Sequence, residues 1–251
     1  TSLKQMFFKR VLFLGVASSL LLTSCAAITK ILPDKKAVSV LSGREAVDGQ
    51  VLAVKIDDTN MAHPQIGLED ADVVYIEQVE GGLTRLAAVF ASKIPVRVGP
   101  VRSARISDID ILSQYGRIAF AYSGAQRKLL PVIAAANLED LGAQHESSKI
   151  FTTDPNRIAP YAMVLRADLL MQKIVDEKLQ VDSAKSVGFV FGDNPEDGIP
   201  TQKVIINWPA ATYSAEWSEK ESRWLLSHNG RLNLADSGVV LGPTTLVIQM
   251  V

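Results

Sequence analysis

The chain has 251 residues, with 26 basic and 27 acidic side chains and a net charge of −1. Hydrophobic residues make up 47% and charged residues 21%, a composition that fits a folded globular protein and excludes a disordered one. A protein needs a net basic face to bind double-stranded nucleic acid. The balanced charge of this chain therefore gives no reason to expect nucleic acid as a partner. Any anion-binding site must therefore come from a few basic side chains close together, and not from an overall positive charge.

The N-terminal segment has the pattern of an export signal. Three basic side chains within residues 4–10 precede an apolar run over residues 11–22. This run is too short for a helix that crosses a bilayer of about 30 Å, but it has the length of a signal-peptide core. It ends in Leu-Thr-Ser-Cys, which resembles the bacterial lipoprotein signal. An ordinary secretory signal is the alternative, although Cys25 is the one cysteine in the sequence.

We therefore predict a lipoprotein signal peptide over residues 1–24, followed by a lipidated Cys25 and a tether over residues 25–46. Each buried methylene contributes about 0.8 kcal/mol, so two or three acyl chains of the palmitate type hold a protein on a membrane. The predicted location is the extracytoplasmic face of the cell membrane. Because Thr1 is not a methionine and the apolar run 244–251 ends without a turn, we expect the natural protein to extend further.

The body is predicted to be an α/β domain over residues 47–185, with a mixed sheet and helices. A mostly β region follows and begins within residues 186–251. Strand patterns fall at residues 51–57, on both sides of Gly81-Gly82, and at 95–98, 117–122, 187–191, 203–208, 213–217, 223–228 and 244–251. Helix patterns begin near Ser107, with Asp110 as its capping partner, at Pro131 and at Met163.

The predicted hairpin at Gly81-Gly82 determines which side chains share a face. A two-residue turn would place Gln78, Glu80, Leu83 and Arg85 together. The opposite face would carry Val73, Tyr75, Glu77, Val79, Thr84, Leu86 and Phe90. We expect this second face to lie against the core, where Glu77 would need a partner.

Common enzyme motifs are absent from the sequence. It has no G-x-S-x-G, no H-E-x-x-H, no phosphate-binding loop ending in Lys-Ser/Thr and no paired cysteines. Its three histidines, at positions 63, 145 and 228, are far apart, so we predict no metal site and no cofactor. Spacing alone does not exclude serine–histidine catalysis, but we identify no catalytic residue and favour a protein that is not an enzyme.

Three arginines, Arg85, Arg102 and Arg105, form what we call the arginine cluster. Guanidinium groups bind phosphate or carboxylate in a two-pronged manner, and a helix N-terminus adds free N–H donors. The candidate anion site consists of Arg85, Arg102, Ser103, Arg105, Glu77 and Glu80. Glu77 or Asp57 would serve there as acid, base or metal ligand. The alternative is structural: Arg85 would pair with Glu80, and the other two arginines with Asp108 or other nearby acids.

Segments around this cluster resemble the YerB-like lipoprotein family of bacteria, which is defined by a domain of unknown function. The shared pattern is Pro-Gln-x-Gly-Leu at 64–68, Ala-Asp at 71–72, Glu-Gly-Gly-x-Thr-Arg at 80–85 and Gly-Pro-Val-Arg-Ser-Ala-Arg at 99–105. The chain departs from the family at Tyr161-Ala162, where members tend to have His-Asn. The resemblance therefore argues against that imidazole as an indispensable base.

The resemblance implies an exported envelope lipoprotein linked to cell-wall synthesis, with no established reaction. A first hypothesis is a non-catalytic protein that binds and regulates a partner in the envelope, such as a wall-building enzyme. A second is a binder or enzyme acting on phosphate- or pyrophosphate-linked glycolipids, by loose analogy with the LytR-CpsA-Psr transferases. A third, direct peptidoglycan binding, would use the aromatic residues Trp208, Tyr213, Trp217 and Trp224.

Overall fold

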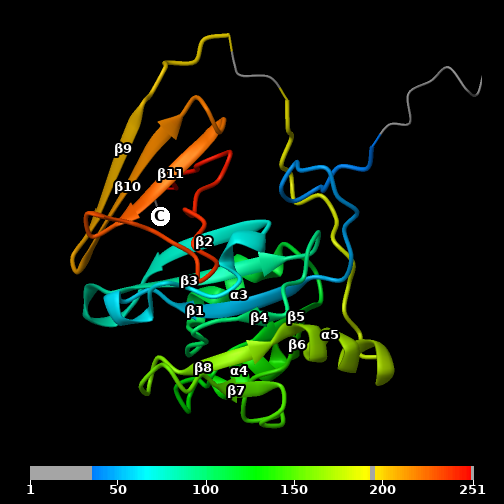
Figure 1. Ribbon diagram of the computed structural model, residues 1–251. Coiled ribbons are helices and arrows are strands. Elements are labelled where there is room, and N and C mark those ends of the chain that lie inside the picture. The colour runs from blue at the N-terminus through cyan, green and yellow to red at the C-terminus, as the bar shows by residue number, and fades with distance from the viewer. Residues whose placement is uncertain (1–35, 193–195, 250–251) are drawn as a thin grey trace, which may run out of the picture. The chain divides into compact units, whose positions relative to one another are not determined.

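The computed structural model describes residues 36–192 and 196–249 (Figure 1). Every helix and strand described lies within residues 38–251. The predicted signal peptide, Cys25 and residues 26–35 of the predicted tether lie outside the described residues. Within the described part, no helix is long and apolar enough to cross a membrane.

A five-stranded mixed sheet forms the centre of the fold, which confirms the predicted α/β class. Its strands run in the order β2 (Val73–Gln78), β3 (Thr84–Phe90), β1 (Leu52–Asp57), β5 (Ile118–Ala121) and β6 (Leu138–Asp140). The β2–β3 and β3–β1 pairs are antiparallel, whereas β1–β5 and β5–β6 are parallel. Every residue of β1 and β3 is buried, as expected for strands covered on both faces.

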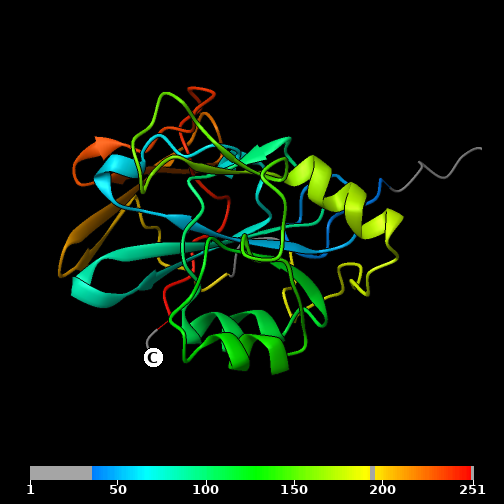
Figure 2. The same cartoon turned by 90° about the horizontal axis from the view of Figure 1, so that it is seen from below.

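Helices and a second sheet cover the two faces of the central sheet. On one face, α3 (Ile106–Ser113) and α4 (Leu130–Ala135) bury Leu112 and Ile133 against Phe120. On the other lie α5 (Ala167–Asp176) and a three-stranded sheet of β4 (Arg97–Val98), β8 (Met163–Arg166) and β7 (Phe151–Thr153). Figure 2 shows α5 and α4 on opposite sides of the central sheet. Both faces of the central sheet therefore contribute to the hydrophobic core.

The C-terminal region is an antiparallel sheet, which confirms the predicted β-rich character. Its strands are β9 (Lys203–Trp208), β10 (Ala211–Ser218), β11 (Arg223–His228) and β12 (Arg231–Leu232). Side-chain and backbone contacts join this region to the loop after β1. Asn229 Nδ2 donates to Asn60 Oδ1 at 2.7 Å, and Gln65 forms a β-bridge with Ala235.

The hairpin differs from the predicted two-residue turn. Glu80, Gly81 and Gly82 form a three-residue 3-10 turn, and both glycines have positive φ, +71° and +73°. The extra residue shifts the register by one position, which moves side chains to the other face. Arg85 therefore lies opposite Glu77 on β2 and opposite Asp57 on β1. The predicted separation of Arg85 from Glu77 was wrong.

Other local predictions also need correction. Helix α3 begins at Ile106, and Asp108 rather than Asp110 accepts the Arg105 backbone N–H, at 2.6 Å. Met163 lies in β8 rather than in a helix, and the helix predicted to begin there starts at Ala167. Residues 187–191 and 244–249 form no strand. The proposed division between domains at residue 185 stays a prediction.

Candidate functional site

A buried lysine lies at the centre of a group of charged side chains near the end of β1. Lys55 has no exposed surface, and its Nζ lies 2.7 Å from Asp108 Oδ1 and also forms an ion pair with Glu77. Glu77 in turn accepts a hydrogen bond from Ser107 Oγ. Burial lowers the pKa of Lys55, and the Asp108 carboxylate opposes that effect. Sequence reasoning missed this residue, although a lone lysine in an apolar run was a usable signal.

The arginine cluster joins the same group through nearby acids, as the structural alternative predicted for Arg102 and Arg105 but not for Arg85. Arg102 Nε lies 2.6 Å from Asp57 Oδ2, and Arg85 Nη1 lies 3.5 Å from Asp57 Oδ1. Arg105, not Arg85, pairs with Glu80, at 2.7 Å. The expected Arg85–Glu80 pair is absent because the register shift places Arg85 opposite Glu77, and the β1–β3 pairing places it opposite Asp57. Burial lowers the pKa of Arg85, whereas Asp57 acts to raise it.

These side chains form what we call the ionic network, in which cations and carboxylates balance. Its members are Lys55, Arg85, Arg102, Arg105, Asp57, Glu77, Glu80 and Asp108. Ser103 contributes its backbone carbonyl, which accepts from Arg105 Nη1 at 3.0 Å. The six residues of the predicted anion site are therefore close neighbours in the fold. Whether they bind an anion stays a prediction.

Free hydrogen-bond donors remain in the ionic network. Among the described residues, Arg102 engages a carboxylate through Nε alone, and its guanidinium carbon lies 6.0 Å from the centre of the Tyr161 ring. The Arg102 side chain is 25% exposed. Its two Nη groups therefore remain able to donate to a ligand from solvent.

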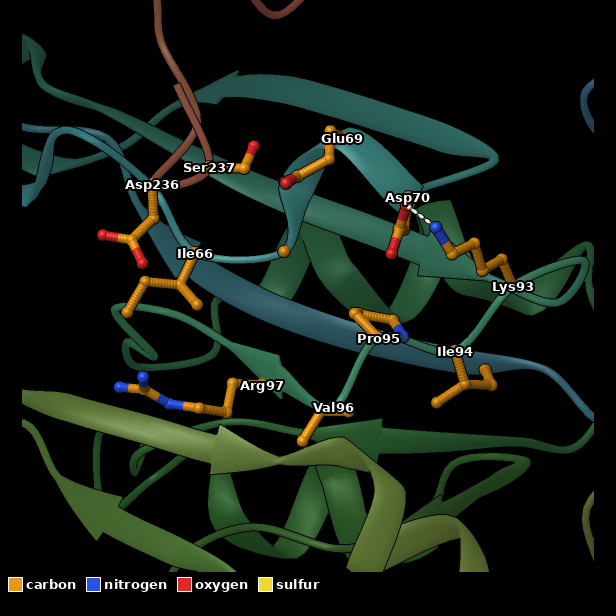
Figure 3. Close-up of a pocket in the computed structure, with 11 residues that line it drawn as sticks. Ile66, Glu69, Asp70, Lys93, Ile94, Pro95, Val96, Arg97, Asp236 and Ser237 are labelled. Atoms are coloured by element: carbon orange, nitrogen blue, oxygen red, sulfur yellow. Dashed lines mark ion pairs between the residues drawn. The ribbon is translucent and has the colours of Figure 1, made fainter. Parts of the chain in front are cut away.

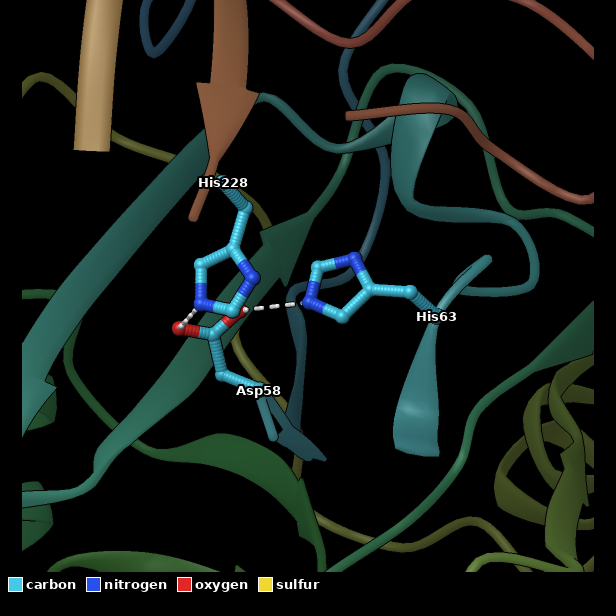
Figure 4. A group of neighbouring side chains, drawn as sticks. All are labelled: Asp58, His63 and His228. Atoms are coloured by element: carbon cyan, nitrogen blue, oxygen red, sulfur yellow. Dashed lines mark ion pairs between the residues drawn. The ribbon is translucent and has the colours of Figure 1, made fainter. Parts of the chain in front are cut away.

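A second group, which we call the histidine cluster, consists of Asp58, His63 and His228 (Figure 4). The His63 and His228 rings stack with centroids 4.4 Å apart. Their Nε2 atoms lie 3.5 Å and 4.0 Å from the two oxygens of the Asp58 carboxylate. The expectation that the histidines are too far apart to share a site was wrong for this pair. Packing of β11 beside the loop after β1 brings them together, and no sequence spacing indicated it.

Neutral donors hold the Asp58 carboxylate in place. Tyr213 Oη donates to Oδ1 at 2.6 Å, and Thr84 Oγ1 donates to Oδ2 at 2.5 Å. Burial raises the pKa of Tyr213, so its hydroxyl stays protonated as a donor. Burial also lowers the pKa of His228, which keeps that imidazole neutral near pH 7.

Two pockets lie near these groups. One, of about 210 Å³, adjoins the histidine cluster and is lined in part by Asp58, Thr84 and His228. A larger one, of about 400 Å³, lies between the Ile66–Asp70 segment and residues 93–97 (Figure 3). The Lys93–Asp70 ion pair, at 2.8 Å, spans part of its lining. Neither of these two pockets is lined by the arginine cluster.

Fold and site together define an α/β protein with a partly buried ionic network and an antiparallel β sheet beside it. The family described as "Protein of unknown function (DUF3048) N-terminal domain" matches residues 40–180, so the chain belongs to this family of YerB-like proteins. The "Putative lipoprotein YerB" of Bacillus subtilis (strain 168) is 40% identical over 91 residues, which is 34% of this chain and 27% of that protein.

A solved structure shares the fold. The crystal structure of YerB protein from Bacillus subtilis matches with a TM-score of 0.69 at 20% identity, covering 82% of this chain and 72% of that chain. The likeness extends over more of the chain than the family match at residues 40–180. It supports the fold described above.

Proposed function

We propose that the chain is a bacterial envelope lipoprotein, anchored to the membrane through Cys25, that binds an anionic group at the arginine cluster. The signal-like N-terminus and the lipoprotein name of the Bacillus subtilis relative support the anchor. The ligand class is a phosphate, pyrophosphate or carboxylate presented in the envelope, as on a cell-wall glycolipid. We assign no reaction to the site.

The proposal rests on which partners the guanidinium groups of Arg102 and Arg105 already have. Arg102 keeps its Nη donors available, as described above. Arg105 is occupied by Glu80, a carboxylate that is 57% exposed. Glu80 belongs to the glycine turn after β2, so the chain itself supplies an anion that a ligand can replace. Charge-assisted contacts of this kind are the strong ones, particularly when two N–H groups meet one carboxylate or phosphate.

Calorimetric titration of the full chain in detergent tests the binding site. The probes are inorganic phosphate, pyrophosphate and a polyprenyl phosphate in micelles, each with and without magnesium. We expect Arg102→Ala to weaken binding at least tenfold, or about 1.4 kcal/mol. The matched control is Arg117→Ala, because Arg117 also pairs with a carboxylate, Glu139, at 2.8 Å, but outside the cluster.

Two outcomes would contradict the binding proposal. One is wild-type protein that binds none of the probes, which would favour the regulatory hypothesis and direct the work to crosslinking of protein partners. The other is equal loss of affinity in both variants, which would show only a general charge effect.

The anchor has a separate test. Cells that express the chain are grown with an alkyne-labelled palmitate, and the protein is isolated and assayed for the label. We expect label in the wild type and none in Cys25→Ser. We also expect the Cys25→Ser protein to be lost from the membrane fraction. Equal labelling of both proteins would refute lipidation at Cys25.

A further inference from the structure

We propose that Asp58, His63 and His228 bind a divalent transition-metal ion of the zinc class. One carboxylate oxygen and two imidazole nitrogens lie within 4.8 Å of one another, and Asp58 and His228 are buried. This site is separate from the arginine cluster, so the inference goes beyond the function proposed above.

The charge of Asp58 is the first reason. The carboxylate is 1% exposed, and its hydrogen bonds come from the neutral groups of Tyr213, Thr84 and Gln65. The nearby cation Arg85 instead forms its ion pair with Asp57. A buried carboxylate is costly unless a cation or metal compensates its charge. A metal ion between Asp58 and the two rings would supply that compensation.

The orientation of His63 is the second reason. Its Nδ1 lies 3.0 Å from Asn233 Oδ1, an oxygen that can only accept, so the proton is on Nδ1. The Nε2 lone pair therefore faces Asp58, where the Gln65 amide now lies 3.2 Å away. Metal-binding histidines commonly donate their other N–H to an oxygen in this way.

Two buried atoms near the carboxylate lack hydrogen bonds, which is the third reason. Among the described residues, His228 Nε2 and Gln65 Oε1 are both buried and unbonded. Buried polar atoms normally have a partner. A metal ion would take the His228 lone pair, and rotation of the Gln65 amide would turn Oε1 toward the ion or its bound water.

The donor set indicates which metal fits. Two imidazoles and one carboxylate are ligands for zinc and similar ions, whereas magnesium and calcium prefer oxygen alone. Ligands at about 2.0–2.1 Å from a tetrahedral zinc lie about 3.3 Å apart. The two Nε2 atoms lie 3.5 and 4.0 Å from different oxygens of Asp58, and the three donor atoms lie within 4.8 Å of one another, so the side chains must move closer together to share one ion. The adjoining pocket of about 210 Å³ leaves room for water as the fourth ligand.

The test uses the untagged full chain, purified in detergent and stripped of metal with a chelator. Cobalt(II) is the probe, because its visible absorption reports tetrahedral coordination, and zinc is then added in competition. We expect one ion per chain, displaced by zinc. His228→Gln and His63→Gln should each weaken binding about 100-fold, and Asn233→Ala about tenfold through loss of the orienting hydrogen bond.

The matched control is His145→Gln. His145 also lies beside an acid, with Nε2 3.3 Å from Asp140 Oδ2, but its side chain is 53% exposed and outside the cluster. Circular dichroism verifies that each variant is folded. Two results would overturn the proposal: wild-type protein without the cobalt band, or folded His63 and His228 variants that bind as tightly as the control.

Discussion

Lys55 and Asp108 form an ion pair inside the core, with Nζ 2.7 Å from Oδ1 and neither side chain exposed. The same carboxylate accepts the Arg105 backbone N–H through Oδ2, at the start of α3. Arg105 then extends to Glu80 at the surface. The pair therefore links a central strand to the helix start that positions part of the arginine cluster.

Removal of one member of this pair should destabilise the protein strongly. We expect Lys55→Met to lower the free energy of unfolding by about 3–5 kcal/mol, because the buried Asp108 and the half-buried Glu77 would keep their charges with less compensation. Urea unfolding monitored by circular dichroism measures the loss. Lys203→Met is the control, since Lys203 and Glu216 form an exposed pair that contributes about 0–1 kcal/mol. Equal small losses in both variants would show that the Lys55 pair is not structural.

Buried tyrosines should make the fold sensitive to alkaline pH. Burial raises the pKa of Tyr115, whose hydroxyl lies 2.7 Å from that of Tyr75. An unfolded tyrosine ionises near pH 10, so above that pH the unfolded state holds fewer protons and stability falls as pH rises. One such group contributes up to about 1.36 kcal/mol per pH unit.

The variant Tyr115→Phe isolates this effect. It should lose about 0.5–1.5 kcal/mol at pH 8 through the missing hydrogen bond. Since phenylalanine does not ionise, the gap to wild type should narrow above pH 10. Urea unfolding at pH 8 to 11 measures both proteins, and a constant gap would contradict the prediction.

The two glycines of the hairpin turn should respond differently to alanine. Both have positive φ, so either substitution should cost about 1–2 kcal/mol in backbone strain. A Cβ at Gly82 would also lie 2.6 Å from Pro209 Cβ, whereas one at Gly81 meets nothing within 4 Å. We expect Gly82→Ala to be the more destabilising by at least about 1 kcal/mol, measured by thermal unfolding. The reverse order would mean that the hairpin does not pack on Pro209.

Release of Arg105 should strengthen anion binding. Glu80→Gln removes the competing carboxylate, and we expect a several-fold lower dissociation constant for pyrophosphate in calorimetry. A hydrogen bond from its own backbone, and then the bond from Arg105, lower the pKa of Glu80 and keep that carboxylate charged at neutral pH. Glu139→Gln, which breaks the Arg117 pair elsewhere, serves as the control. Unchanged affinity in Glu80→Gln would place the ligand away from Arg105.

The sequence by itself determined the class of fold, the strands at residues 51–57 and 203–228, and which residues form the arginine cluster. Local periodicity and turn residues carry that information, because they depend on neighbours within a few positions. The sequence also contained Lys55 as the one basic residue of an otherwise largely apolar strand.

Only the tertiary structure decided which charges meet. A single extra residue in the turn at Gly81 and Gly82 placed Arg85 on the same face as Glu77, since side chains alternate along a strand, and the pairing of β1 with β3 set Arg85 opposite Asp57. Likewise, His63 and His228 meet because β11 packs beside a loop from the other end of the chain. Such contacts depend on how distant elements pack, and no local pattern of residues encodes them.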